Sequence, residues 1–322
     1  MIITSLMKFP VKKVWNKEWI DHLFLFIVFL SIFMICESAS AAPPFMDFEG
    51  VGGGGIVPGS YLVNPPEEGK LIGMPAVSHW SLIGGGNNVY TNGFAFSFLK
   101  RFELGYVIEI ADFHRLRRNL RHDSNGDVNV KKGTIYMNNI HFKTLFIEEM
   151  KYFPAFAVTA EFKFNDTIAE MNKNIGHALD TVGYDDSHGI DIDFTFSKTI
   201  NDLFHLPSII NMPCIINGNL RLTRARYLGF LGFSSDYTLN KELSVEFLPN
   251  PKFAFGYEFR QQNDKFGALP LKDCSMNENT FWDFNIAFFP NDEFSLALAY
   301  TRFGNIVNKD IDFFVCNLKY DF

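Results

Sequence analysis

Residues 102–112 read FELGYVIEIAD, and this stretch carries the pattern that decides the fold. Every second residue is bulky and apolar: Phe102, Leu104, Tyr106, Ile108 and Ile110. The residues between them are smaller or charged, and they include Glu103 and Glu109. Successive side chains of a β-strand point to opposite faces. The stretch is therefore predicted to be a strand with one apolar face and one face that is small or polar.

The same alternation recurs in about twelve segments, most of them near ten residues long: 76–84, 91–99, 102–112, 135–149, 154–165, 188–200, 212–227, 240–248, 252–262, 280–289, 293–303 and 312–322. A tilted strand needs about this length to cross a bilayer. A soluble β-sandwich would also alternate, but its packed core could not accept unpaired charges at mid-strand. The pattern favours an all-β fold, a transmembrane antiparallel up-and-down β-barrel over residues 76–322.

The connections between the segments and the last segment point the same way. Links after even-numbered segments are mostly short and links after odd-numbered segments are mostly longer, which is typical of periplasmic turns and extracellular loops. Both ends of the barrel would then lie on the periplasmic side. The chain stops at Phe322, with Tyr320 on the same face. We expect these two aromatic residues to form the signal that the barrel-assembly machinery recognises.

The first part of the chain is predicted to be a targeting segment. A basic start is followed by an apolar run from Leu23 to Cys36 and by Ala39-Ser40-Ala41, a small-x-small pattern typical of signal-peptide cleavage. We therefore expect residues 1–41 to be a cleaved signal peptide and the outer membrane of a bacterium to be the destination. Residues 42–75 are rich in Gly and Pro and form either a periplasmic segment or a plug inside the barrel.

Composition and motifs exclude several other functions. The net charge of −7 gives no support for a nucleic-acid partner. Residues 50–55 fit G-x-G-x-x-G, but neither a preceding strand nor a following helix accompanies them, as a dinucleotide site requires. The three cysteines after the signal segment are too far apart for a disulfide framework or a metal pattern. With no G-x-S-x-G element either, we expect no enzyme activity, no cofactor and no metal.

Charged residues recur on the face of the segments opposite the bulky apolar one. By parity these side chains point into the lumen of the barrel: Glu103, Glu109, His141, Lys143, Glu161, Lys163, Asp191, Asp193, Arg221, Glu258, Arg260, Asp283 and Lys319, together with Glu242, Glu246 and Asp321. Charges of both signs can form cross-strand pairs that fill a narrow barrel, or can line a watery path and set its selectivity. We predict a narrow, porin-like channel for small polar or ionic solutes. The alternative is a non-conducting structural or surface-interaction barrel that acts through its extracellular loops.

A basic cluster follows the third segment, and its arginines are Arg115, Arg117, Arg118 and Arg121. Guanidinium groups at the outer surface could pair with phosphates or carboxylates of lipopolysaccharide or with an anionic solute. An ordinary charged loop is the alternative. The expected partners are outer-membrane lipid, lipopolysaccharide and the assembly machinery, with a small solute if the lumen conducts.

Several stretches also resemble a known bacterial outer-membrane family, domain of unknown function 3034. The similar stretches are Glu49 to Gly55, Met74 to Ser78, Phe94 to Tyr106, Leu220 to Gly232 and Pro290 to Asn305. The loop at 113–134 matches poorly, and this chain has more Phe and Asn. The resemblance covers nearly all of the chain after the signal segment and implies an outer-membrane barrel, but it supplies no reaction, substrate or catalytic residue.

Overall fold

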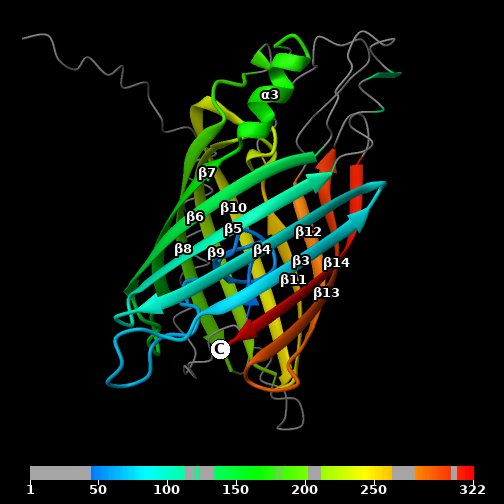
Figure 1. Ribbon diagram of the computed structural model, residues 1–322. Helices are drawn as coiled ribbons and strands as arrows, with labels where there is room; N and C mark the ends of the chain where they lie inside the picture. Colours follow the sequence, from blue (N-terminus) through cyan, green and yellow to red (C-terminus); the bar gives the residue numbers. More distant parts are fainter. Residues whose placement is uncertain are drawn as a thin grey trace, which may run out of the picture.

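The computed structural model describes residues 45–112, 118, 121–122, 134–177, 179–180, 183–201, 212–262, 280–305 and 310–322. Within these residues, twelve antiparallel strands form one closed barrel (Figure 1). The predicted signal peptide, residues 1–41, lies outside the described residues.

The strands follow one another around the barrel in chain order, as an up-and-down topology requires. They are β3 (Ala76–Gly84), β4 (Asn87–Phe98), β5 (Phe102–Asp112), β6 (Thr134–Ile147), β7 (Ala155–Phe164), β8 (His188–Ile200), β9 (Cys214–Ala225), β10 (Phe233–Asn250), β11 (Phe253–Arg260), β12 (Phe281–Phe288), β13 (Phe294–Asn305) and β14 (Asp310–Asp321). The last strand pairs with the first, with Tyr320 opposite Val77. The predicted fold class is confirmed.

Two strands begin earlier than the sequence pattern predicts. Strand β4 begins at Asn87 because Gly85 and Gly86 make a tight two-residue turn with φ of 59° and 78°. Both positions of such a turn need positive φ, which glycine adopts without steric cost. Strand β10 begins at Phe233, which pairs with Ala225, and an irregular register follows before regular pairing resumes at Thr238.

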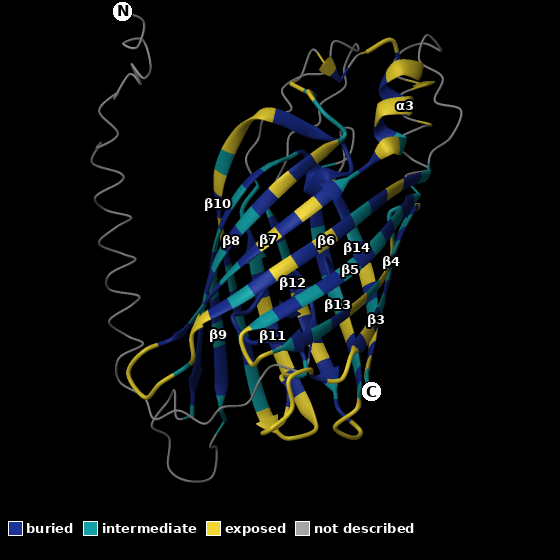
Figure 2. Cartoon of the chain, turned by 60° about the vertical axis from the view of Figure 1, so that its left-hand side comes forward, coloured by how far each residue is buried: buried dark blue, intermediate teal, exposed yellow. Residues whose placement is uncertain are grey.

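The outer surface of the barrel is apolar. Figure 2 shows strands along which buried and exposed residues alternate, and large apolar side chains such as Phe314, Phe284 and Leu298 are more than half exposed. Aromatic rings near the short turns pack in pairs, for example Phe156 and Phe196 with centroids 4.9 Å apart. A closed barrel leaves no strand edge unpaired, which hydrocarbon demands, and aromatic girdles mark the membrane interfaces. The outer surface is thus suited to lipid.

The connections at the end opposite Phe322 contain the helical elements. Helix α3 (Asp166–Asn174) lies in the link between β7 and β8, and the short 3-10 helix η3 (Tyr227–Gly229) lies between β9 and β10 (Figure 1). Asn165 caps α3, because its side chain accepts a hydrogen bond from the Ile168 N–H at 3.1 Å. No helix among the described residues is long and apolar enough to cross a membrane.

Residues 45–63 fill the interior of the barrel, and we call them the plug. Within the plug, β1 (Phe45–Met46) pairs with β2 (Gly52–Gly53). Both ends of the plug lie near the short turns. There, the Phe45 ring is 5.4 Å from the Phe289 ring and the Tyr61 hydroxyl donates to Glu149. Its middle reaches toward the helical end, where the rings of Phe48 and Phe303 lie 5.8 Å apart. The plug therefore enters and leaves the barrel at the same end.

Candidate functional site in the barrel lumen

The charged residues predicted to face the lumen all point inward. Each of the thirteen is buried, with no more than 4% of its surface exposed: Glu103, Glu109, His141, Lys143, Glu161, Lys163, Asp191, Asp193, Arg221, Glu258, Arg260, Asp283 and Lys319. Glu242 and Glu246 are buried with them, whereas Asp321 is partly exposed. The alternation along the strands did not predict Asp47 and Glu49, which lie on the plug and are buried among these charged residues. The charged side chains of the lumen are therefore packed against other protein groups.

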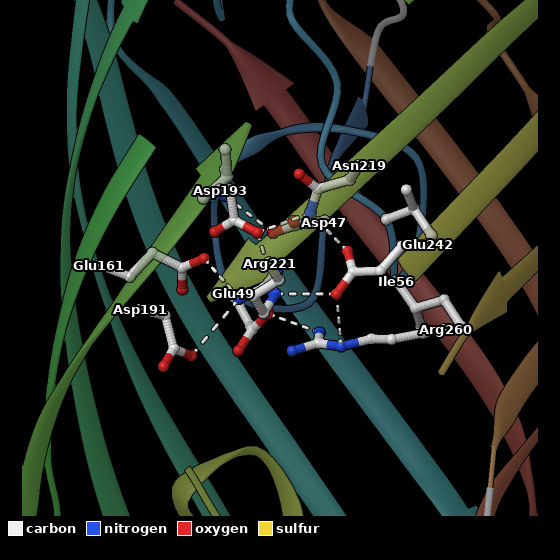
Figure 3. A network of polar contacts seen from close by, with 12 residues as sticks. Asp47, Glu49, Ile56, Glu161, Asp191, Asp193, Asn219, Arg221, Glu242 and Arg260 are labelled. Atoms are coloured by element: carbon white, nitrogen blue, oxygen red, sulfur yellow. Dashed lines mark hydrogen bonds and ion pairs between the residues drawn. The ribbon is translucent and has the colours of Figure 1, made fainter. Parts of the chain in front are cut away.

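Arg221 of β9 is the centre of an ionic network (Figure 3). Its guanidinium lies 2.8 Å from Glu161, 3.0 Å from Asp193 and 2.8 Å from Glu242, which come from three different strands. The strand register brings these groups together, because Asp193 is directly opposite Arg221 on β8. Such a network is stable only because each buried charge meets opposite charges.

The plug joins this network through Glu49. One carboxylate oxygen of Glu49 accepts from Lys163, and the other accepts from Arg260 at 2.6 Å and lies 3.1 Å from Arg221. Three cations from three strands therefore converge on one plug side chain. The backbone carbonyl of Glu49 also accepts from the Asn139 side chain at 3.2 Å. Glu49 is thus the main electrostatic connection between plug and wall.

A second set of contacts holds the plug nearer the short turns. The Glu103 carboxylate accepts from the N–H of Gly52 at 3.1 Å and from the N–H of Val63 at 2.7 Å. The Lys143 ammonium donates to the carbonyls of Gly52 and Tyr61 at 2.8 and 3.0 Å. These wall charges supply hydrogen-bond partners to backbone groups of the plug beyond those of its short β1–β2 ladder.

A third set lies on β10, β11 and β12. Here the carboxylate of Glu258 accepts from three consecutive N–H groups of the plug, at Gly55, Ile56 and Val57. Glu49 joins the plug to the wall by ion pairs, whereas the contacts of Glu258, like those of Glu103, involve backbone dipoles of the plug. The carboxylate of Glu246, on β10, accepts from the Asn285 side chain at 3.0 Å.

The plug fits the wall closely but leaves a cavity of about 20 Å³ along β12, β13, β14 and β3. Its lining includes Phe48 and Ile56 of the plug and Trp80, Glu246 and Asp283 of the wall. A cavity of this size has room for about one water molecule. Passage of a solute along this side would therefore require the plug to move.

Apolar side chains cover the lumen at the helical end. The Asn165 side chain donates to the carbonyls of Gly229 and Phe230 at 3.1 and 3.2 Å, and so holds the loop that contains η3. The Tyr227 hydroxyl of the same loop donates to the Phe303 carbonyl on β13 at 2.6 Å. The Phe230 ring lies 6.4 Å from that of Phe48 in the plug. We call residues 226–232 the cap, and it contacts the plug directly.

The remaining predicted sites lie on the outside. Of the four loop arginines, Arg118 and Arg121 are described and exposed, whereas Arg115 and Arg117 lie outside the described residues. Tyr320 and Phe322 are exposed, and their rings are 5.1 Å apart. In the part of the chain that the structure describes, no three or more His, Cys, Asp or Glu side chains converge as the ligands of a tightly bound metal ion.

A closed barrel of twelve strands, with an apolar outer surface and a charged interior, defines an outer-membrane β-barrel protein. The chain belongs to the family described as protein of unknown function DUF3034, whose match spans residues 43–312. No curated protein matches the chain.

Several solved structures are similar to the chain. The Acinetobacter baumannii outer membrane protein Omp33 is 8% identical over 78% of this chain and 99% of that chain, with a TM-score of 0.44. The NanC porin is 8% identical over 77% and 100% of the two chains, with a TM-score of 0.44. The KdgM porin is 7% identical over 77% and 99%, with a TM-score of 0.39.

Proposed function

We propose that this protein is a gated outer-membrane channel for small polar or ionic solutes, and that the plug, residues 45–63, closes it. One observation carries the proposal: the lumen wall is charged, and what fills it is a short segment of the same chain. Water could wet such a wall once the plug leaves. A barrel filled only for stability would gain as much from apolar packing, because buried ion pairs rarely improve on well-packed hydrophobic residues.

The attachment of the plug is compatible with movement. Its strands β1 and β2 pair only with each other, so the twelve-stranded ladder stays intact if the plug leaves. Both ends of the plug lie at the same end of the barrel, so withdrawal needs no threading of chain through the wall. The contacts that must break include the ion pairs of Glu49 and the backbone hydrogen bonds to Glu103 and Glu258.

The cap favours a second candidate, a non-conducting barrel that acts through its outer loops. Phe230 and Tyr227 cover the lumen at the helical end with apolar contacts, in addition to the plug. In that case the interior would have only a structural role, and exposed loop residues such as Arg118 and Arg121 would bind the partner, for example lipopolysaccharide.

Conductance of Glu49→Lys in a planar bilayer distinguishes the two candidates. The new ammonium would face Lys163, Arg221 and Arg260, and like charges in a buried site repel strongly. We expect the wild-type chain to be silent or to open rarely, and the variant to show discrete steps. The matched control is Glu68→Lys, a reversal of the same type at an exposed residue outside the plug, which should behave like wild type.

Folding is checked first by heat-modifiable migration on gels, and only folded barrels are compared. A second variant combines Glu49→Lys with Phe230→Ala, which removes the ring of the cap that contacts Phe48. Steps in either variant support the channel. Silence of both folded variants contradicts it and favours the loop-driven barrel.

A further inference from the structure

The charges of the lumen wall are unequal in number. Among the described strands, nine buried carboxylates face six buried Lys and Arg side chains. The plug adds the two carboxylates of Asp47 and Glu49 to this excess. With the plug withdrawn, the wall itself therefore still carries net negative charge.

Most of the excess lies on one side of the barrel, at Glu246, Glu258 and Asp283, which we call the acidic wall. Glu258 and Asp283 are directly opposite each other on β11 and β12. Glu246 lies on the neighbouring strand β10, opposite Gly256. Like charges directly opposite in a sheet destabilise it. No Lys or Arg pairs with these three carboxylates among the described residues, whereas Glu161 and Asp193 both pair with Arg221.

Unpartnered acceptor atoms line the cavity beside the acidic wall. Glu246 Oε2 and Asn285 Oδ1 are buried without a hydrogen-bond partner, and both residues line the cavity. The side-chain amide nitrogen of Asn285 donates to the carboxylates of Glu246 and Asp283, at 3.0 and 3.2 Å. The amide oxygen can therefore accept from another group. An unpartnered buried acceptor is costly, and a positively charged group would satisfy it best.

Aromatic rings complete the surroundings of the cavity. Trp80 and Phe303 of the wall line it together with the acceptors, and the indole N–H of Trp80 is also buried without a partner. The faces of aromatic rings attract cations, and ammonium-type cations in particular. The lining thus combines carboxylates and an amide oxygen, which favour positive charge, with aromatic and aliphatic side chains.

In the closed conformation, the plug supplies part of that positive charge. The N–H groups of Gly55, Ile56 and Val57 all point at the carboxylate of Glu258. Consecutive backbone N–H groups form a concave site of positive partial charge for an anion. When the plug leaves, Glu258 loses these three donors and is exposed to the lumen beside Glu246 and Asp283.

We infer that the solute of this channel is a small monovalent cation, and that the acidic wall with Asn285 is its binding site in the lumen. This inference rests on the proposed function, because the site becomes accessible along the lumen only when the plug moves. The cation and the N–H groups of the plug compete for Glu258, so binding of the cation favours the open channel.

The test measures reversal potentials of the full chain in a gradient of KCl, and then of methylammonium chloride. Gly53→Leu opens the channel without altering its charge, because a Cβ at Gly53 would lie 2.3 Å from the backbone nitrogen of Gly59 and disrupt the plug. Strongly charged clefts raise local counter-ion concentration by about tenfold or more, so we expect a cation-to-chloride permeability ratio of about ten. Adding Glu246→Gln to Gly53→Leu should lower this ratio several-fold.

The matched control adds Glu109→Gln instead, which removes one buried and unpartnered carboxylate on β5, outside the acidic wall. A ratio near one in the conducting Gly53→Leu channel overturns the inference but leaves the channel function standing. Equal losses in Glu246→Gln and Glu109→Gln also overturn it, since total charge would then explain the selectivity. If potassium and methylammonium permeate equally, charge alone selects the solute, and a preference for methylammonium shows that the rings contribute.

Discussion

Arg221 and the acidic wall lie in one lumen, but the buried carboxylates near Arg221 are paired with cations and those of the acidic wall are not. Around Arg221, carboxylates from three strands and from the plug share cations at 2.8 to 3.1 Å. At the acidic wall, Glu258 and Asp283 are directly opposite each other, and Glu258 accepts from backbone N–H groups of the plug. The first region binds the plug by ion pairs and the second binds it by dipoles alone.

The region around Arg221 therefore has a structural role, and the acidic wall is the part of the lumen available to a solute. Removing one member of an ion-paired network leaves an uncompensated buried charge, so this network holds its geometry firmly. The carboxylates of the acidic wall are buried, and no Lys or Arg of the described residues pairs with them, so an incoming cation would stabilise them. We therefore assign closure mainly to Glu49 and Arg221, and selectivity mainly to Glu246, Glu258 and Asp283.

The largest effect is expected for Arg221→Met. This change leaves Glu161, Asp193 and Glu242 without their common cation, and breaking a buried pair in this way costs about 3–5 kcal/mol. Urea unfolding of the refolded barrel should show a correspondingly lower midpoint. Arg118→Met, at an exposed loop residue, should leave the midpoint unchanged. Equal midpoints for the two variants would show that the network contributes nothing to stability.

Neutralising one acid should lower the free energy of unfolding near Arg221 but not at the acidic wall. Glu161→Gln removes a partner of both Arg221 and Lys163, and losing a hydrogen bond to a charged group costs about 1.5–3 kcal/mol. Glu246→Gln keeps an acceptor for Asn285 and relieves the repulsion from Glu258, so the free energy of unfolding should stay the same or rise. Urea titrations of the two variants measure both free energies of unfolding. Equal decreases in the two variants would contradict the distinction between the regions.

A smaller effect is expected for Glu258→Gln. The amide keeps one acceptor oxygen for the plug N–H groups of Gly55, Ile56 and Val57 but loses the charge. If closure weakens by about 1 kcal/mol, as for an ordinary hydrogen bond, the open fraction rises about fivefold. Single-channel recordings measure this fraction directly. No change would mean that the dipole contacts do not help to hold the plug.

Much of the barrel could be predicted from the sequence because a strand repeats every two residues. Parity alone put Glu103, Arg221 and Asp283 inside, and the structure buries all three. The early start of β4 was missed, although Gly84-Gly85-Gly86-Asn87 contains a turn signal in Gly85-Gly86. The signal peptide prediction concerns residues outside the described part of the chain.

The contacts across the lumen could not be predicted in the same way. Parity gives the face of a side chain but not its height in the barrel or its partner on the far side. Glu49 and Arg260 are 211 residues apart and meet only because the plug folds inward. Residues 45–63 have no regular period that would reveal their path. A Gly-rich stretch carrying two buried acids in front of a charged barrel is the one signal that could have suggested it.

The most direct test of closure by the plug joins plug and wall reversibly. The Ser197 hydroxyl oxygen lies 2.7 Å from the backbone nitrogen of Ser60, so Ser60→Cys with Ser197→Cys places two thiols at a plug–wall contact. The pair is combined with Glu49→Lys in a full chain whose native cysteines are replaced by serine. In a planar bilayer, we predict silence when the disulfide is formed and discrete conductance steps after reduction. Steps of equal size and frequency before and after reduction would contradict the claim that movement of the plug opens the channel.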